Sequence, residues 1–200
     1  QQGLSDKTYW GAQRSTPNFE ENVSALLAAF RATPGAHILH VCHHSTSPSS
    51  PLHPSKAGVR FMPYAEPVPG EPVFVKTTNS ALVDTELEAV LRGLQLQRLV
   101  IIGLTTAYSV TTTVRMASSL RVVDHRYNRP IRDGEDVVAP GEIILVQDAT
   151  ATFNARFAGK DYDAETVHAI HLATVDGEFC DVETTEQAIQ NLQTRAADST

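Results

Sequence analysis

The stretch LVIIGLTTAYSVTTT, residues 99–113, decides the fold class of this chain. Its apolar start is typical of a buried β-strand, Gly103 introduces a turn, and a helical pattern follows. A strand that passes through a turn into a helix presents the turn at the carboxyl edge of a parallel sheet, where open α/β folds bind ligands. The free N–H groups of a helix beginning near Ser109 would suit an anion or oxyanion there. Ser109 is therefore either a nucleophile or only the N-cap of the helix.

The rest of the sequence alternates in the same way between helical and extended patterns. Apolar residues at helical spacing alternate with short apolar runs, which predicts βαβ units and hence an α/β protein with a mostly parallel sheet covered on both faces. The pattern predicts helices over residues 19–32, 85–94, 111–120, 163–174 and 185–195, and strands over residues 36–42, 72–76, 98–103 and 142–148.

Length and composition restrict the class of protein. With 200 residues, 42% of them hydrophobic, the chain can build one well-buried core and is short for two, so we expect a single domain over residues 1–200. The formal net charge of −7 gives no electrostatic reason to expect a nucleic-acid partner. No apolar run reaches the roughly 18 residues that cross a bilayer, and the polar start QQGLSDK lacks the apolar region of a signal peptide. We therefore expect a cytoplasmic protein without a membrane partner.

The start of the chain departs from the alternating pattern. A doubly wound domain normally opens with an apolar strand, whereas residues 1–4, QQGL, look like the loop after such a strand. The first strand is therefore either lost from this protein or lies before residue 1.

Two segments look like long loops. Residues 43–70 are rich in Ser, Pro and His, a composition typical of an ordered loop that carries function. Residues 124–141 are charged and broken by proline and glycine, and they form an excursion between a helix and the next strand. Ordering so long a polar segment costs about 1–2 kcal/mol per residue, which a subunit contact or a pocket lid would offset. We therefore expect a homo-oligomer.

Lys76 is the second candidate for chemistry. It ends the apolar run VFVK and is the only lysine between Lys56 and Lys160. Burial depresses the pKa of a lysine, which can then act as an acid, a base or an anion partner. The alternative is a strand-end lysine that extends its ammonium group into water. The carboxyl ends of parallel strands meet at one edge, so we expect Lys76, Ser109 and the loop after Cys42 to converge there.

Several motifs in fixed order resemble those of the isochorismatase-like hydrolases, also called the cysteine hydrolase superfamily. They are GEPVFVKTTNSALVDTELEAVLR at residues 70–92, LVIIGLTTAYSVTTTVRMASSL at residues 99–120 and VQDATATF at residues 146–153. QQGLSDKTYWG and HHSTSPSSPLHPSKAG stand where that family has its first loop and its substrate loop, so the resemblance covers almost the whole chain. It implies a Rossmann-like, three-layer α/β/α fold and hydrolysis of amides, vinyl ethers or related bonds in a small-molecule substrate.

The Asp-Lys-Cys catalytic triad of the family corresponds to this chain in part. The lysine of the triad matches Lys76, the cysteine matches Ser109, and the aspartate would lie two residues before Gln1, at the end of the expected first strand. A serine hydroxyl is far less acidic than a thiol, whose reference pKa is about 8.5, so Ser109 needs a strong adjacent base. Lys76 could supply that base. The alternatives are a crippled homologue or a cysteine replaced to trap a ligand.

The resemblance also implies an oxyanion hole and a substrate pocket. In the family a cis peptide precedes the nucleophile and backbone N–H groups form an oxyanion hole, which here would lie near Leu104-Thr105 and at Ser109. Aromatic side chains are candidates for the pocket wall, although packing in the core would also explain each of them. They are Trp10, Tyr108 and Phe153.

Histidines and cysteines raise a metal hypothesis. Related nicotinamidases hold zinc with one Asp and two His, but the substrate loop here lacks the Asp-x-His motif. His43 and His44 are adjacent on an extended stretch and point to opposite sides. Cys42 and Cys180 form no CxxC pair, which favours two buried thiols. We therefore expect no metal and no other cofactor, with His43 or His44 at the substrate pocket and the remaining histidines of this segment in the core or at the surface, namely His37, His40 and His53.

Two hypotheses for the function remain. The first is a small-molecule hydrolase that uses Lys76 and Ser109 for acyl or vinyl-ether cleavage. The second is a catalytically silent protein that keeps the pocket for ligand binding or interaction. Only the hydrolase would form a product or an ester on Ser109.

Overall fold

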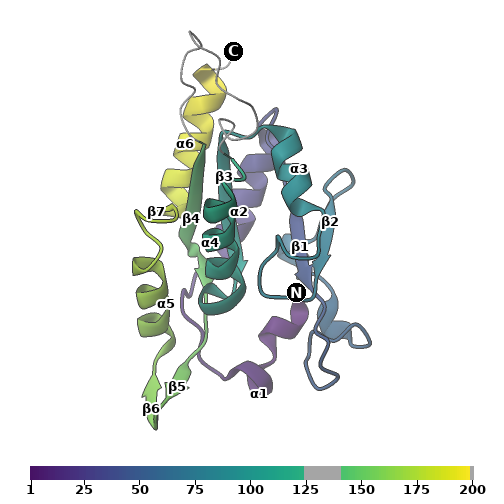
Figure 1. Cartoon of the computed structure of the whole chain (residues 1–200), viewed down its shortest axis with the longest axis vertical. Helices are drawn as coiled ribbons and strands as arrows, with labels where there is room; N and C mark the ends of the chain where they lie inside the picture. The colour runs from purple at the N-terminus through teal and green to yellow at the C-terminus, as the bar shows by residue number, and fades with distance from the viewer. Residues whose placement is uncertain (124–140, 199–200) are drawn as a thin grey trace.

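Helices and strands alternate along residues 1–123 and 141–198, which the computed structural model describes (Figure 1). The expected excursion over residues 124–141, with its lid or subunit contact, lies outside the described residues except for Gly141. The helices are α1 (Lys7–Trp10), α2 (Phe19–Ala32), α3 (Leu87–Leu94), α4 (Thr111–Leu120), α5 (Ala164–Ala173) and α6 (Thr185–Asp198). The strands are β1 (His40–His43), β2 (Val73–Lys76), β3 (Arg98–Leu104), β4 (Glu142–Ala151), β5 (Ala155–Phe157), β6 (Lys160–Tyr162) and β7 (Asp181–Glu183).

The main strands form two parallel sheets. In one, β1 pairs with β2, and His43 lies opposite Lys76. In the other, the order is β3-β4-β7, again with parallel neighbours. A short antiparallel hairpin, β5–β6, extends beyond the end of β4. The parallel pairing confirms the expectation from the alternating pattern, whereas the hairpin was not expected because three-residue strands are too short to show alternation.

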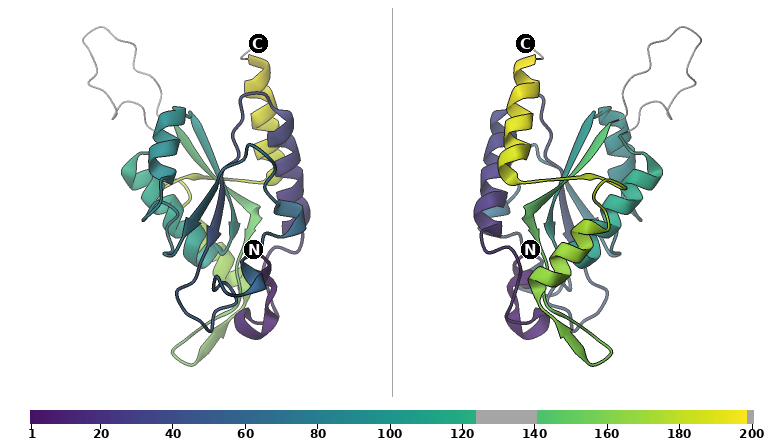
Figure 2. Two further views of the ribbon diagram at one scale, coloured as in Figure 1. Left: turned by 90° about the vertical axis from the view of Figure 1, so that its right-hand side faces the viewer. Right: turned by 90° about the vertical axis from the view of Figure 1, so that its left-hand side faces the viewer.

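Helices cover both faces of the strands in three layers (Figure 2). Helices α2 and α6 lie on one face, and α3, α4 and α5 lie on the other. Successive residues of β4 point to opposite faces, so Leu145 joins the core beneath α4, and Ile144 joins the core beneath α2. This two-sided burial explains why residues 143–146 of β4 form a continuous apolar run, and it confirms the α/β fold class.

Most predicted elements are present, and their ends differ for local reasons. Helices α2 and α4 have the predicted bounds. The strand expected from residue 36 begins only at His40, whose N–H donates to Pro72 C=O at 2.9 Å as the first bond to β2. Strand β4 continues to Ala151 across a register shift beside Gly103. Strand β7 was not expected, because three residues carry too little pattern.

A partly buried ion-pair cluster connects the loop before β2 to α2 and β1. The Glu71 carboxylate accepts from Arg31 Nε at 2.8 Å and lies 2.7 Å from His40 Nε2. It also accepts from the N–H of Val68 at 3.0 Å. These bonds, that of Arg31 above all, hold the pKa of Glu71 at about 2. The end of α2, the start of β1 and the loop are therefore joined through one carboxylate.

Candidate active site

The carboxyl ends of β1, β2 and β3 lie close together, and three side chains meet there. Strand β1 ends at His43 and β2 ends at Lys76, its register partner. Strand β3 passes into a single π-helical turn, Thr106–Val110, which carries Ser109. The structure thus brings residues 43, 76 and 109 together, as the order of strands and turns indicated.

The backbone of the turn shapes the approach to Ser109. Gly103 has φ of +123°, a conformation that side chains with a Cβ rarely adopt. The Leu104–Thr105 peptide is cis, as the resemblance implied. The C=O of Thr105 accepts from the N–H groups of Tyr108 at 3.1 Å and Val110 at 3.2 Å. Two hydrogen bonds to one carbonyl therefore close the turn.

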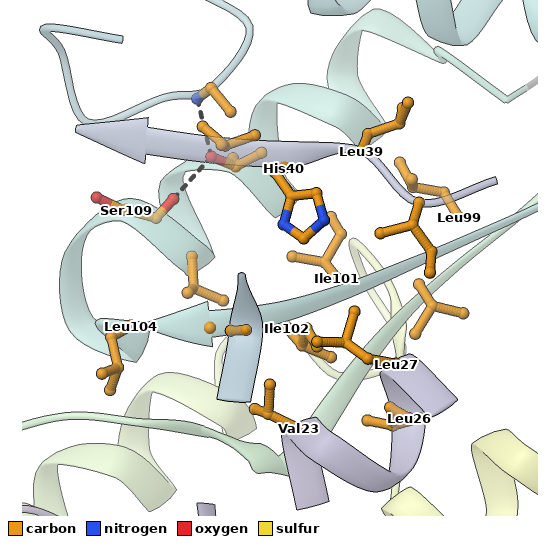
Figure 3. Close-up of a pocket in the computed structure, with 18 of the residues that line it drawn as sticks. Val23, Leu26, Leu27, Leu39, His40, Leu99, Ile101, Ile102, Leu104 and Ser109 are labelled. Carbon is orange, nitrogen blue, oxygen red and sulfur yellow. Dashed lines mark hydrogen bonds between the residues drawn. The ribbon is translucent and has the colours of Figure 1, made fainter. Parts of the chain in front are cut away.

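Ser109 is not the N-cap of the following helix. Val110 occupies the N-cap position of α4, and no side chain caps the helix, which contradicts that alternative. The C=O of Ser109 instead accepts from Thr113 Oγ1 at 2.7 Å, and Thr113 Oγ1 accepts from the N–H of Ala81 at 3.0 Å (Figure 3). The hydroxyl of Ser109 is left to face Lys76.

The Lys76 ammonium group is buried and has three partners. The residue is 5% exposed, which contradicts the alternative of a lysine that reaches into water. Its Nζ donates to Thr78 C=O at 2.7 Å and to Ser109 Oγ at 3.0 Å. His43 Nδ1 lies 3.3 Å from the same nitrogen. Lys76 is therefore oriented by a carbonyl and an imidazole that the sequence did not identify as its partners.

Burial changes the protonation of both basic groups. It lowers the pKa of Lys76 to about 8. It also lowers the pKa of His43, and the charge of Lys76 lowers it further. His43 is therefore neutral at pH 7 and its Nδ1 can accept from Lys76, while roughly a tenth of Lys76 is neutral at that pH.

Gln1 holds His43 in place through a two-point contact. Its Oε1 accepts from the N–H of His43 at 2.7 Å, and its Nε2 donates to the C=O of His43 at 3.0 Å. The same Nε2 donates to Val59 C=O at 3.0 Å. Sequence reasoning missed Gln1, because the two partners are 42 residues apart and no motif links them.

A cavity of about 560 Å³ opens beside these side chains and runs between β1 and β3. Figure 3 shows Leu39 and His40 on one side and Leu99, Ile101 and Ile102 on the other. β1 pairs with β2 and β3 pairs with β4 along their opposite edges, so among the described strands none pairs with the edges that face the cavity. Seven of the expected site residues line it, namely Trp10, His43, Lys76, Leu104, Thr105, Tyr108 and Ser109.

Two of the expected site residues lie outside the cavity lining. The N–H of His44 donates to Lys76 C=O at 2.8 Å, so His44 continues the β1–β2 ladder. Phe153 stacks on Trp10 with ring centroids 5.5 Å apart, so it supports the wall from behind. Neither residue lines the cavity, so the expectation that His44 or Phe153 contacts a substrate stays an untested prediction.

Two of the other histidines, His37 and His40, also line the cavity. His40 pairs with Glu71, His37 is exposed, and His53 contacts Ser55. Both cysteines are buried and free, as expected. Over the described ranges, no group of three or more His, Cys, Asp or Glu side chains could hold a metal ion. Among the helices that the structure describes, none is long and apolar enough to cross a membrane.

Known proteins share both the sequence pattern and the fold. The isochorismatase domain family matches residues 8–187. An uncharacterized isochorismatase family protein of Bacillus subtilis, YrdC, is 34% identical over 192 residues, which cover 96% of this chain and 91% of that protein. A structure described as a hydrolase of the isochorismatase family, from Chromobacterium violaceum, is 36% identical with a TM-score of 0.82, over 97% of this chain and 90% of that one. A cysteine hydrolase from Pseudomonas syringae, 22% identical with a TM-score of 0.76 over 97% and 89% of the two chains, shares the fold.

Proposed function

The chain belongs to the isochorismatase family, and from this premise we propose that it hydrolyses a small molecule with Ser109 as nucleophile and Lys76 as base. The observation that carries the proposal is the 3.0 Å contact between Lys76 Nζ and Ser109 Oγ. A lysine must lose a proton before it can accept one from a serine, and a pKa of about 8 makes that loss accessible near neutral pH.

The reaction begins at the neutral form of Lys76. Its Nζ takes the hydroxyl proton as Ser109 Oγ attacks the carbonyl carbon of an amide or ester. Lys76 then gives this proton to the leaving amine or alcohol, whose bond to the carbonyl carbon breaks. A water molecule, deprotonated in turn by Lys76, attacks the acyl ester on Ser109. The bond between the acyl carbon and Oγ breaks, Lys76 returns the proton to Oγ, and the acid is released.

The partners of Lys76 suit both of its protonation states. In the neutral amine, two N–H groups can bond to Thr78 C=O and His43 Nδ1, which leaves the lone pair directed at Ser109. After proton transfer the third N–H has Ser109 Oγ or the leaving group as its acceptor. Because both states are satisfied, Lys76 can cycle between them without moving its chain.

Backbone N–H groups beside the nucleophile support the oxyanion. Thr105 C=O occupies the N–H groups of Tyr108 and Val110. The N–H of Ser109 is therefore the donor that we assign to the substrate oxyanion, at the start of the helical segment whose dipole favours negative charge. This assignment places the carbonyl oxygen of the substrate against the turn and its acyl part toward Trp10 and Leu104, which line the cavity.

A second candidate function is ligand binding without turnover. It is favoured by the 3.0 Å contact in which Lys76 Nζ donates to Ser109 Oγ, since a pKa of about 8 leaves most molecules protonated at pH 7. In that state Lys76 donates to Ser109 Oγ instead of accepting its proton. The pocket would then bind a ligand that the hydroxyl does not attack.

Covalent labelling separates the two functions. We would incubate the protein with activated esters, amides and vinyl ethers, and separately with a fluorophosphonate, and measure intact mass and released product. Hydrolase function requires a mass gain that is lost in Ser109→Ala and Lys76→Met and retained in Ser119→Ala, the control at an exposed serine on α4. Binding of these compounds with neither modification nor product would establish the second function.

A further inference from the structure

His168 links the Ser109 turn to β4, although no residue of α5 lines the cavity. It is 7% exposed. Its Nδ1 lies 2.9 Å from Thr106 Oγ1, and its Nε2 lies 3.0 Å from Gln147 C=O. Thr106 itself is completely buried. Both ring nitrogens of this buried side chain therefore have partners, one a side-chain hydroxyl and the other a backbone carbonyl.

The direction of each bond follows from the acceptor on β4. A carbonyl oxygen only accepts, so His168 Nε2 carries the hydrogen and donates to Gln147. Burial lowers the pKa of His168, which is neutral at pH 7, so its Nδ1 keeps a lone pair. Thr106 Oγ1 must then donate to Nδ1. The imidazole is held in one tautomer, and the Thr106 hydroxyl is held in one orientation.

Thr106 is the residue through which this contact reaches the nucleophile. It is the first residue of the π-helical turn that contains Ser109. Its C=O accepts from Thr111 Oγ1 at 2.8 Å, so the same residue is also joined to the first turn of α4. A shift of Thr106 should therefore move Ser109 with it, since only Ala107 and Tyr108 separate the two residues within one hydrogen-bonded turn.

We propose that His168 is a positioning residue that holds the turn, through Thr106, so that Ser109 Oγ stays within reach of Lys76 Nζ. This inference rests on the proposed function where it treats Ser109 as the nucleophile. The alternative is that His168 only fastens α5 to the rest of the protein. The two roles predict different effects on kcat. If His168 positions the turn, loss of its bond to Thr106 should lower kcat more than loss of its bond to Gln147.

Two substitutions at His168 each preserve one of its bonds. In His168→Asn the amide oxygen can accept from Thr106, and in His168→Gln the amide nitrogen can donate to Gln147 C=O. We expect His168→Gln to lower kcat by about 10- to 100-fold with KM changed less than about 3-fold, because a misplacement of about 1 Å can cost on the order of 100-fold. His168→Asn should retain kcat within a few-fold, and His171→Asn, on the same helix, is the matched control.

Thr106 provides an independent variant at the other end of the bond. Thr106→Val removes the hydroxyl with little change of shape and should reproduce the loss of kcat seen in His168→Gln. Thr106→Ser keeps the hydroxyl and should therefore retain kcat. The double variant Thr106→Val with His168→Gln should be no worse than either single variant, since both remove the same bond. Additive losses would overturn the inference.

A thiol in place of Ser109 gives a readout that does not depend on turnover. In Ser109→Cys the Lys76 ammonium should hold the thiol pKa below its usual value of about 8.5. The pH dependence of iodoacetamide alkylation reports that pKa, while Cys42 and Cys180 are buried. We expect His168→Gln and Thr106→Val to raise the thiol pKa toward about 8.5, and His168→Asn to leave it unchanged.

The two readouts keep the proposals apart. If the protein hydrolyses none of the compounds tested, the proposed function fails. The thiol pKa of the Ser109→Cys protein still tests the positioning role of His168. If His168→Gln and Thr106→Val lower only the melting temperature and leave the thiol pKa of the Ser109→Cys protein unchanged, His168 stabilises the fold alone and the inference is overturned.

Discussion

Lys76 Nζ lies 3.0 Å from Ser109 Oγ, although the residues are 33 positions apart and the strands that lead to them, β2 and β3, belong to two separate sheets. Lys76 is the last residue of β2, and Ser109 follows β3, in the turn after that strand. The contact therefore depends on how the two sheets are placed relative to one another. The contact places a lysine whose pKa is lowered beside the Ser109 hydroxyl. The following predictions test this pair.

The activity should depend on the protonation of Lys76. Because the neutral amine is the base, kcat/KM should rise with pH through about 8 and level off above it. Lys76→Arg keeps the positive charge but cannot lose its proton, so kcat/KM should fall by about 10²- to 10⁴-fold. Initial rates with an activated ester from pH 6 to 10 measure both effects. A pH-independent rate for the natural sequence would contradict the assignment.

Burying Lys76 should cost stability. Its pKa falls from 10.5 unfolded to about 8 folded, so between these pH values the unfolded chain binds more protons and the free energy of unfolding rises with pH. Lys76→Met removes the cost of burying an ammonium group and should raise the free energy of unfolding at pH 7 by roughly 1–3 kcal/mol. Urea unfolding at pH 7 and pH 10 measures the gain, which should shrink at the higher pH. A less stable Lys76→Met at pH 7 would show that the hydrogen bonds of the ammonium outweigh its desolvation.

Ser109→Cys should react faster than the protein with Ser109. A thiolate forms beside the Lys76 ammonium far more easily than an alkoxide does, so hydrolysis of activated esters should increase by about 10-fold or more. Stopped-flow or steady-state assays at pH 7 compare the two proteins. Absence of a gain across esters, amides and vinyl ethers would mean that the pocket does not present a carbonyl to this position.

Glu71 should govern stability in acid. Its pKa lies at about 2 in the folded protein against 4.5 ordinarily, so the unfolded chain binds more protons between these values, and the free energy of unfolding falls as pH decreases through them. Glu71→Gln should be less stable at pH 7 and should lose less stability than the natural sequence between pH 5 and pH 3. Denaturant titrations at these three pH values test this, with Glu66→Gln, exposed in the same loop, as the control.

The cavity between β1 and β3 should accept a further parallel strand. His40 and His44 direct their N–H groups to the β2 side, so the N–H and C=O of Val41 point into the cavity. Apolar side chains from both layers surround the space. In a protein produced as residues 1–200, a seven-residue Val/Ile strand fused ahead of Gln1, matching the length of β3, should therefore raise the melting temperature by several degrees.

Hydrogen exchange identifies where such a strand lies. Amide protection should increase at Val41 and Val100, which line the cavity from β1 and β3. A fused segment of equal length with proline at its centre should give neither effect, because proline removes a ladder donor. An unchanged melting temperature with the Val/Ile strand would contradict the prediction.

The sequence by itself determined the class of fold, several element boundaries and the two residues with the clearest chemistry. Helices α2 and α4 were predicted to the residue, because amphipathic spacing and a proline-glycine stop are local signals. Lys76 and Ser109 stood out for equally local reasons, since each ends or follows an apolar strand. The family motifs around them then indicated a hydrolase.

Only the tertiary structure decided which side chains surround these two residues. Gln1 clamps His43, Thr78 C=O orients Lys76, and His168 reaches the turn through Thr106. Each of these partners is determined either by how separate segments pack or by the path of a loop backbone. Neither of these two causes produces a periodic pattern or a motif in the sequence. Hydrophobic patterning therefore determines which face of an element is buried, whereas the pairing of polar groups at the carboxyl edge follows from the packing of the layers.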